Sequence, residues 1–149
     1  MENEVTYKPV IEKILSDFYP GIKLHRTFDL YADQFVPYDY ESDLLPDQKK
    51  RVFVELKTIK TDCWGYDDNV EGIDLLTIHE GRALRALCAI NPHFDCFLFV
   101  IYIPKKQVCY TRIDRLTPMV KRPNHWLGKQ MYWIPKESFN CVLLEQTLP

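Results

Sequence analysis

The longest uninterrupted apolar segment of the chain, residues 97–103 (FLFVIYI), contains seven residues. A membrane-spanning helix needs roughly 20 apolar residues, so this segment is too short to be one. A short apolar run rich in β-branched and aromatic residues is typical of a buried strand. The chain must therefore build a core around this strand, and 46% of its residues are hydrophobic and available for that core.

The segments around this strand predict further elements. Pro9 fits the first turn of a helix, and an apolar stripe follows at helical spacing: Val10, Ile11, Ile14, Leu15 and Phe18. Thr77 and Glu80 have the spacing of a capping box, which predicts a second helix that ends near residues 91–92. Extended segments or strands are predicted at residues 22–36, 51–59, 95–103, 108–113 and 130–134, a loop at 60–72, and a short irregular or helical piece at 114–121. This order predicts an α/β fold, a sandwich with a mixed central sheet flanked by helices.

The length of 149 residues fits one domain, with residues 116–149 as its C-terminal extension. The acidic N-terminus has no apolar stretch of the kind found in signal peptides. Five cysteines, an odd number without a CxxC pair, are most simply interpreted as free buried thiols in a reducing compartment. We therefore expect a cytoplasmic protein with no membrane partner.

Charge is distributed unevenly along the chain. Residues 1–103 carry 11 Lys or Arg and 18 Asp or Glu, a net charge of −7, whereas residues 104–149 carry 8 and 3, a net charge of +5. The total of −2 argues against tight, nonspecific coating of DNA. The basic C-terminal third can still face phosphates, so the asymmetry is a reason to look for a local site.

The segment RVFVELKTI places Glu55 and Lys57 on one face of a predicted strand, because alternate side chains of a strand share a face. Val52, Val54 and Leu56 point to the opposite face, toward a core. A charged pair among apolar residues has a desolvation cost, which suggests that something binds there. An upstream acid across a hairpin would give Glu55 a partner and form a two-carboxylate site of the hard oxygen ligands that suit Mg²⁺.

Several acids could be that partner. Asp43 lies 12 residues before Glu55 and is the preferred candidate, with Asp39, in Pro37-Tyr38-Asp39, as the main alternative. Asp29 and Asp33 would need longer hairpins, and Asp47 is too close to Glu55 and lies in a turn. Glu12, on the first helix, is a further candidate ligand.

The pattern Asp-x(11)-Glu-Leu-Lys, with a helix before it and helix–strand–strand after it, resembles the PD-(D/E)xK nuclease superfamily over roughly residues 5–115. The segments ELKT, His79-Glu80, FLFVIYI and VCY are most similar to the Holliday-junction-resolvase-like and phage-type members. Those often carry a Gln on the helix after the ExK strand, where this chain has His79 and Glu80. The resemblance implies a restriction-endonuclease-like fold and cleavage of DNA with Mg²⁺ or Mn²⁺. Asp43 and Glu55 would hold the metal, and Lys57 would assist the attacking water.

Further expectations concern partners. Arg82 and Arg85 on the second helix, with Lys105 and Lys106 after the apolar strand, are candidate phosphate contacts or simply solvated surface. The C-terminal aromatic residues Trp126, Tyr132 and Trp133 are candidates for stacking on bases. Packing in the core or at an interface is the preferred expectation for them. By analogy with small nucleases, a homodimer is possible. The alternatives are a catalytically inactive module on the same fold, which binds nucleic acid or a protein, and a protein-interaction domain that uses the aromatic C-terminal segment.

Overall fold

The computed structural model of the chain describes residues 2–31, 36, 38–61, 65–67, 70–124 and 127–147. Its helices are α1 (Glu2–Leu15), α2 (Thr27–Leu30) and α3 (Ile78–Ile90). Its strands are β1 (Leu24–Arg26), β2 (Tyr40–Ser42), β3 (Arg51–Ile59), β4 (Gly65–Asp67), β5 (Val70–Thr77), β6 (Phe94–Tyr102), β7 (Gln107–Ile113), β8 (Val120–Asn124), β9 (Lys129–Pro135) and β10 (Asn140–Leu143). Three 3₁₀ turns, η1 (Ile103–Lys105), η2 (Lys136–Ser138) and η3 (Leu144–Gln146), complete the described elements.

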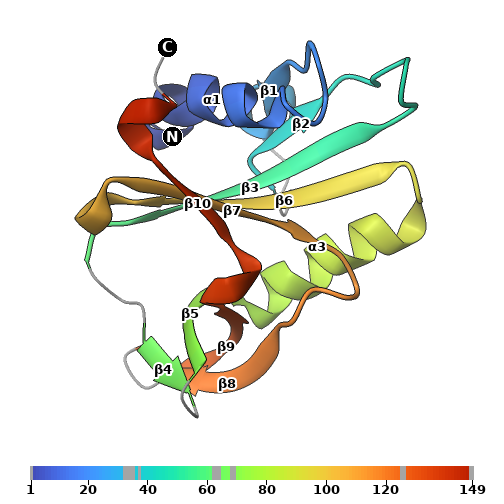
Figure 1. Ribbon diagram of the computed structural model, residues 1–149. Coiled ribbons are helices and arrows are strands. Elements are labelled where there is room, and N and C mark those ends of the chain that lie inside the picture. The colour runs from blue at the N-terminus through green and yellow to red at the C-terminus, as the bar shows by residue number, and fades with distance from the viewer. Residues whose placement is uncertain are drawn as a thin grey trace.

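The strands form two sheets. The main sheet has the order β1-β2-β3-β6-β7-β10 and the second sheet the order β4-β5-β9-β8. Strands β3 and β6 are parallel, with α3 in the connection between them, and the other neighbours in the main sheet are antiparallel. The prediction of an α/β fold with a mixed sheet is confirmed. Figure 1 shows the main sheet between α1 on one side and α3 with the second sheet on the other.

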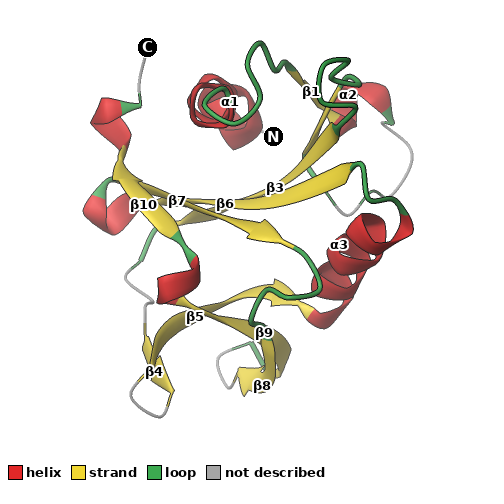
Figure 2. Cartoon of the chain, turned by 45° about the vertical axis from the view of Figure 1, so that its right-hand side comes forward, coloured by secondary structure: helices red, strands yellow, loops and turns green. Residues whose placement is uncertain are grey.

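Strand β3 buries both of its faces. Val52, Val54 and Leu56 pack on the side of α1, where Ile11 and Leu15 belong to the same apolar cluster. On the opposite face Phe53 belongs to a second cluster, which includes residues of α3, β6, β7 and the second sheet. Figure 2 shows α1 and α3 on opposite sides of the main sheet. The face that carries Glu55 and Lys57 is thus partly enclosed rather than open to solvent.

The second sheet corrects the prediction of a loop at residues 60–72. Strand β4 and the start of β5 lie in that range, and β5 pairs with β9 from the C-terminal part of the chain. Helix α3 packs closely on this sheet, since a Cβ atom at Gly81 would lie 2.3 Å from the ring of Tyr132. The segment at 114–121, predicted to be irregular or helical, is irregular up to the start of β8 at Val120. Strand β10, near the C-terminal end of the described residues, closes the β7 edge of the main sheet.

Helix α1 starts earlier than the sequence suggested. It begins at Glu2, so Pro9 lies inside the helix and not in its first turn. Proline cannot donate a backbone hydrogen bond, but an interior position is tolerated here because Val10, Ile11, Ile14 and Leu15 anchor the following turns in the core. Phe18 does not continue the apolar stripe, since it is 52% exposed. Tyr19 is buried in its place.

The cysteines are not all free. Cys109 on β7 and Cys141 on β10 face each other in register and form a disulfide. The prediction of free thiols is therefore wrong for this pair, and the argument from it to a reducing compartment loses that support. Cys88 and Cys96 are free, as predicted, and Cys63 lies outside the described residues. Within the described ranges, no helix combines the length and apolar content that crossing a bilayer requires.

Candidate active site

Asp39 is the acid that the fold brings to Glu55. Its backbone N–H donates to the carbonyl of Val54 at 2.7 Å, and its own carbonyl accepts the N–H of Thr27 at 2.9 Å. Its carboxylate accepts the N–H of Leu56 at 2.7 Å. These contacts fix Asp39 between the start of β2 and the middle of β3, where its carboxyl group shares a hydrogen bond with that of Glu55.

Glu55 lies in the interior of the main sheet, between β2 and β6, and is 6% exposed. Burial, the hydrogen bond with Asp39 and the negative charge of Asp39 raise the pKa of Glu55 to about 10, and Lys57 offsets only part of this shift. Without a cation, Glu55 is therefore protonated at neutral pH. The neutral acid is the stable form because a second carboxylate stands beside it in a dry environment.

Glu4, near the start of α1, also contacts Asp39. Burial and the hydrogen bond with Asp39 raise the pKa of Glu4 to about 7. The helix start is fixed above Asp39 because the buried Tyr40 donates its hydroxyl to the carbonyl of Glu4. Asp39 thus links two other carboxyl groups, one from α1 and one from β3.

Lys57 lies on the same face of β3 as Glu55 and is held by α3. Its Nζ is 2.7 Å from Glu80 Oε2. The other oxygen of Glu80 accepts the N–H of Thr77 at 3.0 Å, and the Thr77 hydroxyl accepts the N–H of Glu80, so the predicted capping box is present. Burial alone would raise the pKa of Glu80, but the hydrogen bonds from Lys57 and Thr77 outweigh it and lower that pKa below its usual value. The carboxylate of Glu80 thus both caps the helix and holds the ammonium group of Lys57.

Two of the predicted ligands lie elsewhere. Asp43, the preferred partner of Glu55, has a side chain that is 79% exposed and pairs with His25 at 3.1 Å. Asp43 follows β2, whereas Asp39 precedes it, and it is Asp39 that reaches the centre of β3. Glu12 accepts the N–H of Leu24 at 2.8 Å and so fixes β1 against α1. The candidate set is therefore Asp39, Glu55 and Lys57, with Glu4 in place of Glu12, and Asp33 lies outside the described residues.

The basic candidates differ in their surroundings. Arg82, Lys105 and Lys106 are exposed, on α3 and in the turn after β6. Arg85 is turned inward instead: it donates to the carbonyl of Thr117, and its guanidinium lies 5.9 Å from the centroid of the Tyr132 ring. Arg85 thus holds α3 to the segment before β8.

The C-terminal aromatic side chains also pack inward. Tyr132 and Trp133 are buried, and the guanidinium of Arg122 lies 3.8 Å from the centroid of the Trp133 ring. Core packing, not base stacking, is the role that the structure shows for both. Trp126 lies outside the described residues.

The carboxyl groups of Asp39 and Glu55 can supply two oxygen ligands to a small hard cation such as Mg²⁺. Among the described residues, no three His, Cys, Asp or Glu side chains converge on one metal-sized position. Mg²⁺ is usually held by one or two carboxylates, with waters and substrate phosphates completing its shell. Asp39 and Glu55 could supply such a pair, and a divalent cation would replace the protons that the carboxyl groups share in its absence.

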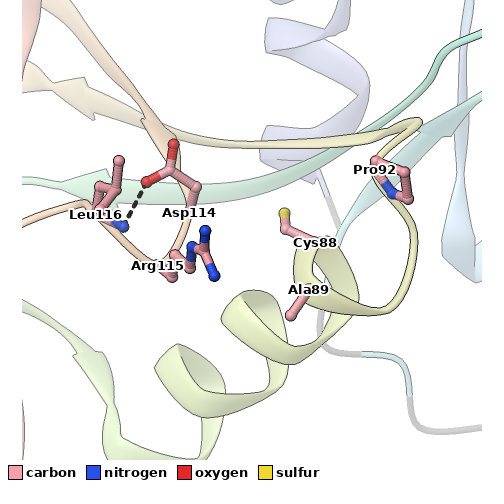
Figure 3. Close-up of a pocket in the computed structure, with 6 residues that line it drawn as sticks. All are labelled: Cys88, Ala89, Pro92, Asp114, Arg115 and Leu116. Atoms are coloured by element: carbon pink, nitrogen blue, oxygen red, sulfur yellow. Dashed lines mark hydrogen bonds between the residues drawn. The ribbon is translucent and has the colours of Figure 1, made fainter.

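A hollow of about 320 Å³ lies at the other end of α3 and is unrelated to this site. Cys88, Ala89 and Pro92 line it from α3 and the turn that follows, opposite Asp114, Arg115 and Leu116 (Figure 3). Asp114 is engaged with its own loop, because its carboxylate accepts the N–H of Leu116 at 2.7 Å. This hollow offers neither paired carboxylates nor a lysine.

The roles of Glu4 and Glu80 become visible only in the structure. Pro9 as a first-turn residue predicts a helix that starts after Glu4, and the sequence places Glu80 at the helix cap and after the ExK strand without linking it to Lys57. Lys57 and Glu80 lie 23 residues apart in the sequence, so only the packing of α3 against β3 brings them together. Neither a family model nor a curated protein nor a solved structure matches this chain.

Proposed function

We propose that the protein is a divalent-metal-dependent nuclease of the PD-(D/E)xK type that hydrolyses phosphodiester bonds in DNA. The observation that carries the proposal is the pairing of the Asp39 and Glu55 carboxyl groups beside Lys57 on a partly enclosed face of the main sheet. The upstream acid, the strand acid and the strand lysine are the three residue types of that motif. The proposal therefore keeps Glu55 and Lys57 and uses Asp39 as the upstream acid.

In this proposal each residue of the site has its own role. Asp39 and Glu55 would hold Mg²⁺ or Mn²⁺, which when bound polarises the scissile phosphate and acidifies a water molecule. Lys57 presents an ammonium group that can donate to a phosphate oxygen and offset the charge that develops there. Glu80 fixes the position of that ammonium group, so Lys57 does not have to be ordered when the substrate arrives.

The proposal is tested by incubating the protein with supercoiled plasmid and with single-stranded DNA in Mg²⁺, Mn²⁺ or EDTA. We expect cleavage that EDTA abolishes and that falls by about 100-fold or more in both Glu55→Gln and Lys57→Ala. Glu55→Gln is preferred to an alanine variant because it preserves volume in a buried position. Circular dichroism establishes that each variant is folded, and full cleavage by folded Lys57→Ala would overturn the assigned role of the lysine.

The catalytically inactive module remains the second candidate. It is favoured by the absence, among the residues that the structure describes, of three converging metal ligands. The same experiment separates the two candidates: DNA binding without cleavage in either metal supports the module. Measuring the molar mass with and without DNA by light scattering tests the proposed homodimer.

A further inference from the structure

A pocket of about 370 Å³ lies beside the candidate active site, on the β1–β2 side of the main sheet. Its walls include Tyr31, Glu41 and Arg51, with His25 and Asp43 also lining it. This volume lies within the range of roughly 300–1,000 Å³ that is usual for small-molecule sites. Its lining combines charged and polar side chains with the apolar Leu30, which predicts recognition by hydrogen bonds as well as by packing.

The position of the pocket follows from strand geometry. Glu41 is opposite Phe53 in the β2–β3 register, and Phe53 shares a face of β3 with Glu55. Glu41 therefore lies on the face of the candidate site, two residues beyond Asp39. Two residues of a strand span about 7 Å, which is comparable to the separation of neighbouring nucleotides. On β3, Arg51 precedes Phe53 by two residues and therefore lies on the same face of that strand.

Glu41 is the unusual group in this pocket. It is 6% exposed, and it accepts the hydroxyl hydrogen of Tyr31. A carboxylate has two oxygens and about four acceptor positions, so one hydroxyl leaves acceptor capacity for a ligand. Tyr31 fixes the carboxylate in one orientation, as a recognition group requires.

The charges of the pocket point to a particular base. A carboxylate accepts hydrogen bonds only, and the Watson–Crick edge of guanine presents adjacent N–H donors at N1 and N2. Its O6 and N7 atoms are acceptors that suit an arginine such as Arg51. Guanine combines two adjacent donors with two acceptors, whereas cytosine and adenine each present a single exocyclic amino donor. Such an edge can be reached only on an unstacked base, as in single-stranded or distorted DNA.

We infer that this pocket binds a guanine base, with Glu41 at its N1 and N2 donors and Arg51 at its O6 and N7 acceptors. Resting on the proposed nuclease function, the inference makes the pocket a specificity site for a nucleotide next to the scissile phosphate. The substrate is then DNA with an unpaired guanine close to the cut.

Binding of single nucleotides tests the pocket without requiring catalysis. The full chain in EDTA is titrated calorimetrically with dGMP, dAMP, dCMP and dTMP. We expect dGMP to bind with a Kd roughly tenfold lower than that of the other three. Glu41→Gln should weaken dGMP binding roughly tenfold, because an amide turns one acceptor into a donor that opposes the guanine donors. Asp47→Asn, at an exposed position of the turn between β2 and β3 that does not line the pocket, should change the Kd by no more than about twofold.

Because Glu41 is buried, Arg51→Gln provides a second variant, expected to weaken dGMP binding at least about fivefold. Equal Kd values for the four nucleotides, or a folded Glu41→Gln that keeps the preference for dGMP, would overturn the inference. Mapping the cut sites of the active protein separates this result from the nuclease proposal. Cleavage without guanine preference in binding rejects the pocket alone, whereas selective dGMP binding without any cleavage rejects the nuclease alone.

Discussion

Asp39 and Asp43 are two aspartates of one hairpin with opposite surroundings. Asp39 donates its backbone N–H to Val54, accepts the N–H of Leu56 and faces Glu55, whereas Asp43 is exposed beside His25. An exposed ion pair of this kind contributes little to stability or to a distant reaction. The two residues therefore form a matched pair for testing which acid serves the site.

Asp39→Asn should lower metal-dependent DNA cleavage by about 100-fold or more, because it removes one of two proposed metal ligands. Asp43→Asn should stay within about twofold of the wild-type rate, since its carboxylate lies outside the cluster. Initial rates on plasmid DNA, with isothermal titration of Mn²⁺ for each variant, provide the measurement. If Asp43→Asn were the inactive variant, the assignment of Asp39 would be wrong.

Protonation of Glu55 makes stability depend on pH in a defined direction. The pKa of Glu55 is raised from 4.5 to about 10 in the folded state, so between these values the folded protein binds the extra proton. The free energy of unfolding therefore falls as pH rises, by at most about 1.4 kcal/mol per pH unit from this residue. Glu55→Gln removes this contribution, because an amide does not titrate.

We expect Glu55→Gln to be close to wild type in stability near pH 5 and more stable, by about 1–3 kcal/mol, near pH 7 in EDTA. Urea unfolding at the two pH values measures the difference. Added Mg²⁺ should stabilise the wild type near pH 7 but not the variant, since binding to the folded state requires the carboxylate. A stability difference independent of pH would contradict the buried, protonated state of Glu55.

Among the elements, helix α3 positions a residue of the candidate site through its first turn. Its N-terminal cap is Thr77, and its first-turn acid, Glu80, holds both the cap backbone and the ammonium group of Lys57. Gly81 allows the next turn to approach Tyr132 on β9. A side chain at this position would clash with the Tyr132 ring and displace the helix, and with it Glu80.

Glu80→Gln and Thr77→Ala should separate the two roles of the cap. Thr77→Ala removes the hydroxyl and should lower the free energy of unfolding by about 1 kcal/mol. It leaves the Lys57–Glu80 contact and hence the turnover rate unchanged. Glu80→Gln should lower kcat roughly tenfold at unchanged KM, because Lys57 loses its charged anchor but the substrate contacts remain. Steady-state kinetics with urea unfolding measure both; a fall of kcat in Thr77→Ala alone would contradict this division.

The elements also show which structure is predictable from local sequence. Strands β3, β6 and β7 are evident because alternation or an apolar run marks each of them, and the capping box marks α3. Strand β5 is hidden, because Gly72 and Asp74 interrupt its pattern and its partner β9 lies far along the chain. Helix α1 is recognisable only from Pro9 onward, since its first turns carry no apolar stripe. Glu55 and Lys57 follow from strand periodicity, but Asp39 was only an alternative because hairpin register is a tertiary property.

For the molecule as a whole, the C-terminal third completes both sheets. Strands β8 and β9 extend the second sheet, and β10 joins the edge of the main sheet beside β7. The net charge of +5 over residues 104–149 is therefore carried by strands and turns of both sheets, rather than by a separate tail. Length and composition predicted the size of the core, but they did not indicate that distant segments pair to build it.

The disulfide Cys109–Cys141 ties β10 to its neighbour β7 at the edge of the main sheet, across a sequence separation of 32 residues. A crosslink of this span stabilises a folded chain by about 2–4 kcal/mol, mainly by restricting the unfolded state. The double variant Cys109→Ser/Cys141→Ser should therefore lower Tm by roughly 5–15 °C. Dithiothreitol should lower the Tm of the wild type by a similar amount. Cleavage at 25 °C should be unchanged, because β10 lies at the opposite edge of the sheet from β1 and β2.

Cys88→Ser is the control, since a serine hydroxyl can replace the thiol that donates to Ile113. Equal Tm values with and without reductant would show that the two cysteines do not form a stabilising bond.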